Sequence, residues 1–308
     1  MIETFLLPLP HGITLSCRAA GPRGAPVLLF LHGFPEAAFV WDDLLTHFAR
    51  PEHGGWRCIA PNLRGFETSS APAEVAAYRA KPLVQDIAAL IAVATADSPT
   101  PGRLGALIAH DWGGALAWSV AAQHGPAVHR LVILNAPHPG PFQRELAHSA
   151  AQQAASEYMN FLAQPDAPER LADNDFARLW PFFGRMAGGE DPAWLDEATR
   201  ERYRAVWRLG LRGPCAYYAA SPLRPPTPSD PGAAAVTLPP ALVRVDVPTL
   251  VVWGLADTAL PPALLDGLDH WVGDLRIERL PGATHWLVHE RPREVATLIA
   301  SHLPPATA

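Results

Sequence analysis

Short, continuous apolar runs recur along this chain. They lie at residues 26–31, 56–61, 104–110, 128–135, 249–253 and 275–280. Runs of this length are typical of strands that are buried on both faces of a sheet. A looser alternation over residues 6–19 turns at Pro10-His11-Gly12, and it predicts a β-hairpin ahead of the buried strands.

Helical patterns separate several of these runs. We predict helices over residues 41–48, 81–96, 114–124 and 293–302 from the spacing of their apolar residues. Strands that alternate with helices form a mostly parallel sheet covered by helices on both faces. The fold class that follows is α/β.

This alternation stops between Pro137 and about Pro240. Apolar residues there recur every three or four positions, which predicts helices over residues 144–163, 175–183, 191–207 and 211–219. Seven prolines between Ser221 and Pro240 exclude a helix or a central strand, so this stretch is expected to be a stiff, irregular connection. We predict an α/β core of residues 1–137 and 236–308, and a helical cap of residues 138–235, called the cap segment below.

Composition excludes several classes of protein. The 308 residues are 49% hydrophobic and 18% charged, as in a globular chain. A net charge of −6 disfavours binding to nucleic acid. No apolar run reaches the ~18–20 residues of a membrane helix, and the N-terminus lacks a signal-peptide pattern. Three scattered cysteines without a CxxC indicate neither a disulfide framework nor a zinc site. We expect a cytoplasmic monomer or homodimer.

The sequence AHDWGG at 109–114 lies between a predicted strand and a predicted helix. Small residues stand two places before and two places after Asp111, as in the G-x-S-x-G nucleophile elbow of a strand–turn–helix. The sharp turn of an elbow exposes the central side chain above the sheet. Asp111 is therefore the candidate nucleophile, although an aspartate at a helix start is also an ordinary capping residue.

Two partners follow in the order that such a fold requires. Asp257 comes just after the predicted strand at 249–253, and His285 comes just after the strand at 275–280. Nucleophile, acid and histidine is the expected chain order. All three follow parallel strands, whose carboxyl ends form the binding edge of an open α/β sheet. Asp257 and His285 are therefore the candidate partners of Asp111.

The sequence HGFPE at 32–36 follows the first buried strand. A loop at this position can direct backbone N–H groups at a developing negative charge. We expect the N–H groups of Phe34 and Trp112 to form this oxyanion site. His32 and Pro35, which belong to the same loop, are expected to contact the substrate.

An aspartate nucleophile restricts the chemistry. Attack by a carboxylate on an acyl carbon would give a reactive anhydride, whereas attack on an sp³ carbon gives an ordinary ester that activated water can hydrolyse. The electrophile is therefore expected to be an epoxide or an alkyl halide. An opened epoxide needs a proton donor, and phenols suit this task. The cap segment offers Tyr158 and the pair Tyr217-Tyr218.

From Pro26 to His302 the chain resembles the epoxide hydrolases of the α/β-hydrolase fold. The resemblance rests on HGFPE at 32–36, RG at 64–65, HDWGG at 110–114, NAPHP at 135–139, WGLAD at 253–257 and GATHW at 282–286. It implies Asp111 as the nucleophile, His285 as the base and Asp257 as the orienting acid. It also implies two cap tyrosines that hold the epoxide oxygen, of which the first is Tyr158.

The chain departs from this family at two places. Glu67 stands where the family usually has a glycine, which leaves the shape of that turn open. Ala216 and Tyr217 replace the usual Asn and Trp before the second tyrosine. Tyr218 matches that tyrosine's position, but Tyr217 also stays a candidate.

Two alternatives use the same fold. Haloalkane dehalogenases favour an asparagine where Phe34 stands, and haloacetate dehalogenases place arginines where Trp112 and Ala115 stand. A third alternative is a non-catalytic receptor for a small molecule, which has no need of a complete Asp111, His285 and Asp257 set. Esterases or C–C hydrolases with an unusual nucleophile complete the range.

The expected ligands are a small apolar epoxide and water. We expect no metal and no organic cofactor, since no glycine-rich phosphate loop and no metal-ligand cluster is found in the sequence. The predicted pocket lies between core and cap. Its expected walls are aromatic, formed by Trp112, Phe34, Phe39, Trp180 and Trp286.

Overall fold

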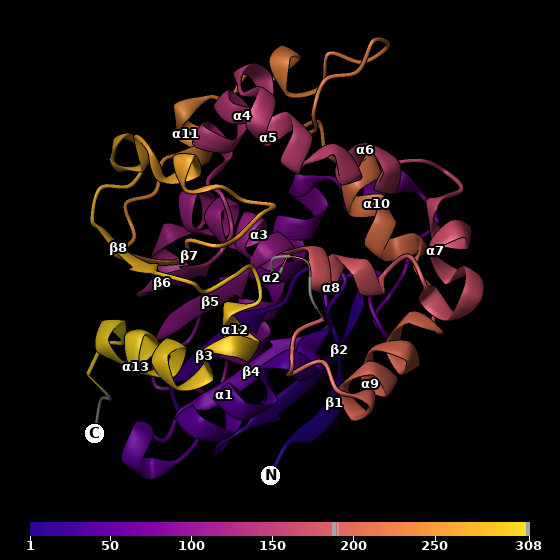
Figure 1. The fold of residues 1–308 in the computed structure, drawn as a ribbon. Helices are drawn as coiled ribbons and strands as arrows, with labels where there is room; N and C mark the ends of the chain where they lie inside the picture. The colour runs from indigo at the N-terminus through magenta and orange to yellow at the C-terminus, as the bar shows by residue number, and fades with distance from the viewer. Residues whose placement is uncertain (187–188, 190, 306–308) are drawn as a thin grey trace.

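In the computed structural model, which describes residues 1–186, 189 and 191–305, one eight-stranded sheet forms the centre of the protein (Figure 1). The spatial order of the strands is β1-β2-β4-β3-β5-β6-β7-β8. β2 pairs antiparallel with β1 and β4. The remaining strands run parallel to one another, in the order β4-β3-β5-β6-β7-β8. The predicted α/β class is confirmed. The strands are β1 (Glu3–Pro8), β2 (Thr14–Ala20), β3 (Val27–Leu31), β4 (Arg57–Pro61), β5 (Ala106–His110), β6 (Leu131–Leu134), β7 (Thr249–Gly254) and β8 (Leu275–Leu280).

Helices cover both faces of the sheet. Along β3, Leu28 and Phe30 belong to a core shared with α1 (Asp42–Phe48) and α13 (Pro292–His302). Leu29 and Leu31 belong to the opposite core, shared with α2 (Ala80–Ala94) and α3 (Asp111–Gln123). Because every second side chain of a strand points to the same face, a continuous apolar run supplies both cores.

The predicted strands and core helices agree with the structure to within a few residues. β6 begins at Leu131 rather than at residue 128, where a single bridge joins Leu104 to Val128. α3 begins at Asp111, three residues before the predicted start. This difference matters for the site, because it places the candidate nucleophile in the first turn of a helix.

The cap segment follows β6 and is rich in helices, which cross the top and right-hand side of the sheet in Figure 1. The irregular stretch that follows them contains the short 3₁₀ turn Gly232–Ala235, and the chain returns to the sheet through α11 (Pro240–Val243). The division into two domains stays a prediction. The helices of the cap segment are α4 (Pro139–His148), α5 (Ala150–Ala155), α6 (Glu157–Leu162), α7 (Ala167–Phe176), α8 (Trp180–Met186), α9 (Glu197–Trp207) and α10 (Arg212–Ala220).

Three predicted helices of the cap segment had wrong boundaries. The single helix expected over residues 144–163 is three helices, which are broken at Ser149 and Ser156. The helix expected over 175–183 begins later, at Trp180 of α8, because α7 ends at Phe176 and Asn174 and Asp175 take left-handed backbone angles. The helix expected over 191–207 begins at Glu197. Serine, asparagine and aspartate favour such breaks, since their side chains bond nearby backbone groups.

The turn that contains Glu67 keeps a left-handed conformation, with φ of 51°. Its carboxylate accepts hydrogen bonds from the Thr68 N–H at 2.7 Å and the Thr68 hydroxyl at 2.6 Å, and also from the Ser16 hydroxyl. These bonds offset the steric cost that a side chain pays at positive φ. The turn therefore forms without the glycine that the family usually has there.

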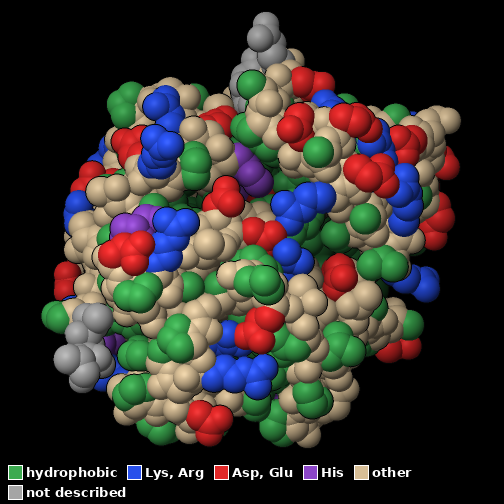
Figure 2. Space-filling model, turned by 90° about the horizontal axis from the view of Figure 1, so that it is seen from below, with side chains coloured by type: hydrophobic (Ala, Val, Ile, Leu, Met, Phe, Trp, Pro, Cys, Tyr) green, Lys and Arg blue, Asp and Glu red, His purple; other side chains and the backbone are tan. Residues whose placement is uncertain are grey.

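Charged side chains are mixed on the face shown in Figure 2, where basic side chains lie beside acidic ones. Ion pairs of this kind are also found along α9, where Arg204 pairs with Glu197 and Arg208 pairs with Glu201. The three cysteines are buried free thiols. Among the residues that the structure describes, no helix combines the length and the apolar character needed to cross a membrane.

Candidate active site

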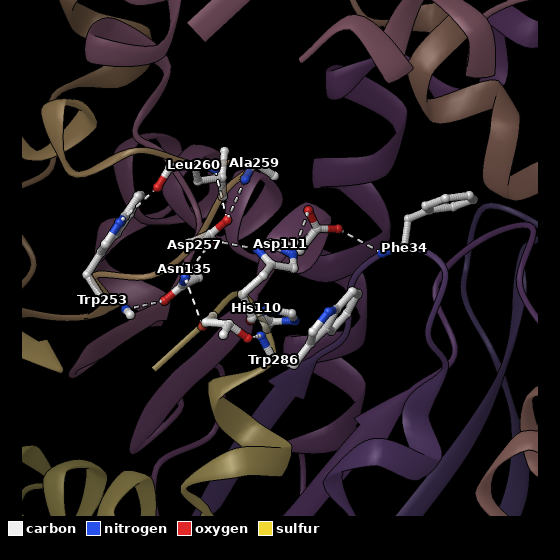
Figure 3. Close-up of polar contacts among 12 residues, drawn as sticks. Phe34, His110, Asp111, Asn135, Trp253, Asp257, Ala259, Leu260 and Trp286 are labelled. Carbon is white, nitrogen blue, oxygen red and sulfur yellow. Dashed lines mark hydrogen bonds and ion pairs between the residues drawn. The ribbon is translucent and has the colours of Figure 1, made fainter. Parts of the chain in front are cut away.

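Asp111 lies at the turn from β5 into α3 with a φ of 49°. A non-glycine residue in this region is strained, and such strain persists where the surrounding packing enforces it. The carboxylate lies at the N-terminus of a helix, where the helix dipole favours negative charge. Its Oδ1 accepts a hydrogen bond of 2.7 Å from the Phe34 N–H (Figure 3).

Glycines allow the close approach on which this turn depends. A Cβ atom on Gly33 would overlap Cβ and Oδ1 of Asp111. A Cβ atom on Gly113 would overlap the carbonyl groups of Leu31 and His32. The loop after β3 and the start of α3 can therefore touch only because both positions lack a side chain.

The structure brings the three predicted catalytic residues together at the carboxyl ends of β5, β7 and β8. His285 Nδ1 lies 2.7 Å from Asp257 Oδ2, and His285 Nε2 lies 3.8 Å from Asp111 Oδ2. Asp257 is fully buried and His285 is 2% exposed, whereas Asp111 is 15% exposed. The aspartate that faces His285 Nε2 is thus the one that a small molecule can reach.

Backbone and side-chain donors fix Asp257 in place (Figure 3). Its Oδ1 accepts the N–H groups of Ala259 and Leu260, both at 2.9 Å. Its Oδ2 accepts the amide of Asn135 at 2.6 Å, and Asn135 Oδ1 in turn accepts the Gly254 N–H at 2.8 Å. A carboxylate held by several donors keeps one orientation.

Three charges determine the protonation of His285. Burial alone would lower the pKa of its imidazole. The charge and hydrogen bond of Asp257, together with the charges of Asp111 and Glu36, raise that pKa to about 9. The imidazole of His285 is therefore protonated at neutral pH.

A small cavity of about 70 Å³ lies at Asp111. Its wall is mostly apolar, with four polar side chains, among them the candidate nucleophile and two tyrosines. The residues of the wall are Asp111, Trp112, Ala115, Pro137, Pro139, Phe142, Tyr158, Met159, Tyr218, Ser221, Leu223 and Leu260. The cavity combines an apolar lining with a few convergent polar groups, as small-molecule sites do.

Tyr158 and Tyr218 reach the cavity from α6 and α10, and their ring centroids lie 6.1 Å apart. Burial raises the pKa of both phenols above the usual range, and the charge of Asp111 raises it further. Tyr158 also borders a wider outer groove of about 1020 Å³, with Phe161 and Phe182 among its other walls. Tyr158 therefore lines both the small cavity and the outer groove.

Tyr217 faces away from the cavity. Its hydroxyl donates to the Arg64 carbonyl at 3.0 Å, and its ring packs against Phe66 and Tyr78. Of the two neighbouring tyrosines that the sequence left open, Tyr218 is the one that lines the cavity.

The remaining predicted residues divide between the cavity and its support. Trp112 lines the cavity, and Phe34 contributes its N–H while its ring packs against Tyr218. His32 Nε2 accepts the Leu63 N–H, and the Pro35 carbonyl accepts the indole of Trp207.

Three of the aromatic residues that we expected in the wall pack elsewhere. Phe39 lies against Tyr203, and Trp180 lies against Trp207. The Trp286 indole donates to the Phe183 carbonyl, and its ring lies beside His285. These rings support the site from behind rather than line the cavity.

Sequence reasoning missed two groups of polar residues. Asn135, at the end of β6, shares the sheet edge with the other site residues, and this position was the signal that could have identified it. Glu36 and His110 form a buried pair behind His285, with His110 Nε2 2.9 Å from the His285 carbonyl. Within residues 1–186, 189 and 191–305, no group of three or more histidine, cysteine or acidic side chains is placed to hold a metal ion.

Comparison with known proteins gives consistent matches. The family described as the alpha/beta hydrolase fold matches residues 26–292. Epoxide hydrolase 3 of Xenopus tropicalis is 32% identical over 302 residues, which cover 95% of this chain and 75% of that relative.

Solved structures agree with the sequence matches. A Bacillus megaterium epoxide hydrolase in complex with an inhibitor superposes with a TM-score of 0.82 at 25% identity, over 96% of this chain and 99% of that one. One of the epoxide hydrolases from metagenomes of hot environments superposes with a TM-score of 0.79 at 35% identity, over 98% of both chains.

The raised pKa of His285 predicts a specific pH dependence of stability. The folded state holds the proton more tightly than the unfolded state, in which the pKa is 6.5. The stabilisation is therefore complete below about pH 6.5 and is lost as the pH rises through about 9. Its size is on the order of 3 kcal/mol.

Urea unfolding of the wild type and of His285→Gln, at a pH below and a pH above this window, measures the effect. The free energy of unfolding of the wild type should fall more than that of the variant. Other titrating groups are common to both proteins and cancel in the comparison. An equal fall in both proteins would mean that folding does not raise the pKa of His285.

Proposed function

The chain belongs to the α/β-hydrolase family, and from this premise we propose that it converts epoxides to vicinal diols through an ester on Asp111. The relatives named above are epoxide hydrolases of the same fold. The observation that carries the proposal is the arrangement at one cavity of Asp111, backed by His285 and Asp257, opposite Tyr158 and Tyr218. Each of these groups has a distinct task in the reaction.

In the first step Asp111 attacks a carbon of the epoxide ring. Its Oδ1 is held by the Phe34 N–H, so Oδ2, which faces His285, is the attacking atom. A new bond forms between Oδ2 and the carbon while the C–O bond of the ring breaks. The electron pair of that bond moves to the epoxide oxygen, which becomes an alkoxide.

A phenol of Tyr158 or Tyr218 donates a proton to this alkoxide. The pKa of both phenols is above the usual range in the free enzyme, because burial and the charge of Asp111 disfavour a phenolate. Ester formation removes the charge of Asp111 and produces the alkoxide, a stronger base than a phenolate. Proton transfer is therefore favoured at the moment when the ring opens.

In the second step His285 takes a proton from water, and the water oxygen attacks Cγ of Asp111. The loss of the Asp111 charge in the first step lowers the pKa of His285, so the imidazolium of the free enzyme releases its proton to solvent before it accepts one from water, and it regains a proton from solvent when the Asp111 carboxylate is restored. The Cγ–Oδ2 bond then breaks, and the departing diol oxygen takes the proton from His285. Asp111 returns as a carboxylic acid, and its proton restores the tyrosine.

Backbone N–H groups stabilise the negative charge that develops on Oδ1 during this attack. The Phe34 N–H already donates to this atom at 2.7 Å. The Trp112 N–H belongs to the first turn of α3, where N–H groups lack partners within the helix. N–H groups that are already in position before the charge forms on Oδ1 strongly lower the activation barrier of ester hydrolysis.

The cavity favours a small apolar substrate. Its volume of about 70 Å³ and the side chains of Phe142, Met159 and Leu223 leave little room beside the reacting carbon. A longer substituent would extend past Tyr158 into the outer groove.

A paired assay tests the choice between the proposed reaction and dehalogenation. The purified protein should release diols from a panel of small epoxides and no halide from haloalkanes or haloacetates. The reason is that the Phe34 side chain packs against aromatic rings and offers no donor to a halide. Halide release without diol formation would assign the dehalogenase reaction instead, and neither product would favour a receptor.

The tyrosines give a second prediction. Tyr158→Phe and Tyr218→Phe should each slow epoxide opening, and loss of general acid catalysis is worth roughly 10²-fold. Tyr217→Phe is the matched control, because its hydroxyl bonds the Arg64 carbonyl and should leave the opening rate close to that of the wild type. Stopped-flow rates of opening measure all three. If Tyr217→Phe alone were slow, Tyr217 would be the proton donor.

A further inference from the structure

Two side chains of α9 contact the loop that carries the Phe34 N–H. The indole Nε1 of Trp207 donates to the Pro35 carbonyl at 2.7 Å. The hydroxyl of Tyr203 donates to Oε1 of Glu36 at 2.9 Å. Tyr203 is fully buried and Trp207 nearly so. The cap segment therefore forms hydrogen bonds to Pro35 and Glu36, the two residues that follow Phe34.

Glu36 connects Tyr203 to His285 through His110. Its Oε2 lies 3.2 Å from His110 Nδ1, and His110 Nε2 lies 2.9 Å from the His285 carbonyl. His289 Nε2 lies 2.6 Å from Glu36 Oε1. Burial alone would raise the pKa of Glu36, but His289 and His110 lower it below the usual range. Tyr203 thus donates to a charged acceptor, which makes a stronger hydrogen bond.

Other contacts hold α9 firmly against the same stretch of the core. Arg202 Nη2 lies 2.6 Å from Asp42 Oδ2, and the Arg202 guanidinium lies over the Phe39 ring at 4.3 Å. The Phe39 ring also packs against Tyr203 at 4.9 Å. These contacts fix α9, and with it Trp207 and Tyr203, against the core.

We propose that Trp207 and Tyr203 are positioning residues that hold the Phe34 N–H against Oδ1 of Asp111 for hydrolysis of the ester. This inference rests on the proposed function. When water attacks Cγ, the electron pair of the Cγ=Oδ1 bond moves to Oδ1, where the Phe34 N–H meets it. The attack on the epoxide carbon places no new charge on Oδ1, so a loosened loop slows hydrolysis much more than ester formation.

The packing of Trp207 and the donor function of its indole can be separated. Its ring lies against Phe176 and Trp180, whereas its Nε1 points to the Pro35 carbonyl. Trp207→Phe keeps an aromatic ring and removes the donor. Tyr203→Phe removes a single oxygen atom, so it tests the same idea even if the tryptophan variant does not fold.

Each variant has a matched control. Trp118→Phe also removes a buried indole donor to a backbone carbonyl, that of Ala136, and Tyr78→Phe also removes a hydroxyl bonded to a carbonyl, that of Pro72. These controls carry the general cost of losing a buried hydrogen bond. Neither of them contacts the loop from Phe34 to Glu36 through that bond.

The experiment is rapid quenching of the full-length protein with propylene oxide, followed by mass spectrometry of the Asp111 peptide. In Trp207→Phe and Tyr203→Phe the ester should decay about tenfold more slowly, a fraction of what loss of one oxyanion donor costs. Its rate of formation should stay within about twofold of the wild type. The fraction of enzyme present as ester should therefore rise in both variants and not in the controls.

The outcomes separate the two proposals. If the wild type formed diol without any detectable ester, even when quenched early, the proposed function would fail. An ester that decayed at the wild-type rate in both variants would overturn the positioning role. If the ester also decayed more slowly in the two controls, the effect would come from a general loss of stability, and the positioning role would be overturned as well.

Discussion

The structure depends on one close approach, between the loop after β3 and the turn after β5. Asp111 takes a positive φ there, and Gly33 provides the space for its carboxylate. Because β3 and β5 are neighbours in the sheet while the chain continues from them in opposite directions, a crevice opens at their carboxyl ends. The strain at Asp111 is held by the packing of two buried strands and a helix, and it leaves one carboxylate oxygen on the Phe34 N–H and the other facing His285.

The electrostatics of the site follow from this placement. Asp257 and Asp111 lie on opposite sides of the His285 imidazole, and both favour its protonated form. Asp257 is buried and is held in one position by four hydrogen bonds of 2.6–2.9 Å from backbone, amide and imidazole groups. Asp111 loses its charge when it forms an ester. In the proposed reaction the same event that makes the intermediate therefore prepares the base that hydrolyses it.

Much of this arrangement could be predicted from the sequence. Buried strands appear as continuous apolar runs, so the α/β fold and the sheet edge at Asp111, Asp257 and His285 followed from pattern and order, and the resemblance to epoxide hydrolases is confirmed by the relatives. The roles of the site residues stay predictions. The choice between Tyr217 and Tyr218 could not be made, because adjacent residues of a helix differ by about 100° in direction and only packing decides which one faces the cavity.

The misjudged parts have a common physical cause. Breaks in the cap helices depend on the capping bond of Ser149 and on the left-handed backbone angles of Asn174 and Asp175, which the spacing of apolar residues does not reveal. The network of Glu36 consists of polar residues that are buried, and burial of a polar side chain is decided by contacts between distant segments. Sequence patterns therefore predicted the sheet and its edge better than the supports behind it.

One measurement tests the central claim most directly. A single turnover of an epoxide in water labelled with heavy oxygen distinguishes attack by Asp111 from direct attack by water. If the ester forms and water attacks Cγ, the diol leaves without the label and the Asp111 carboxylate acquires it. A labelled diol from the first turnover, with an unlabelled Asp111, would contradict the account.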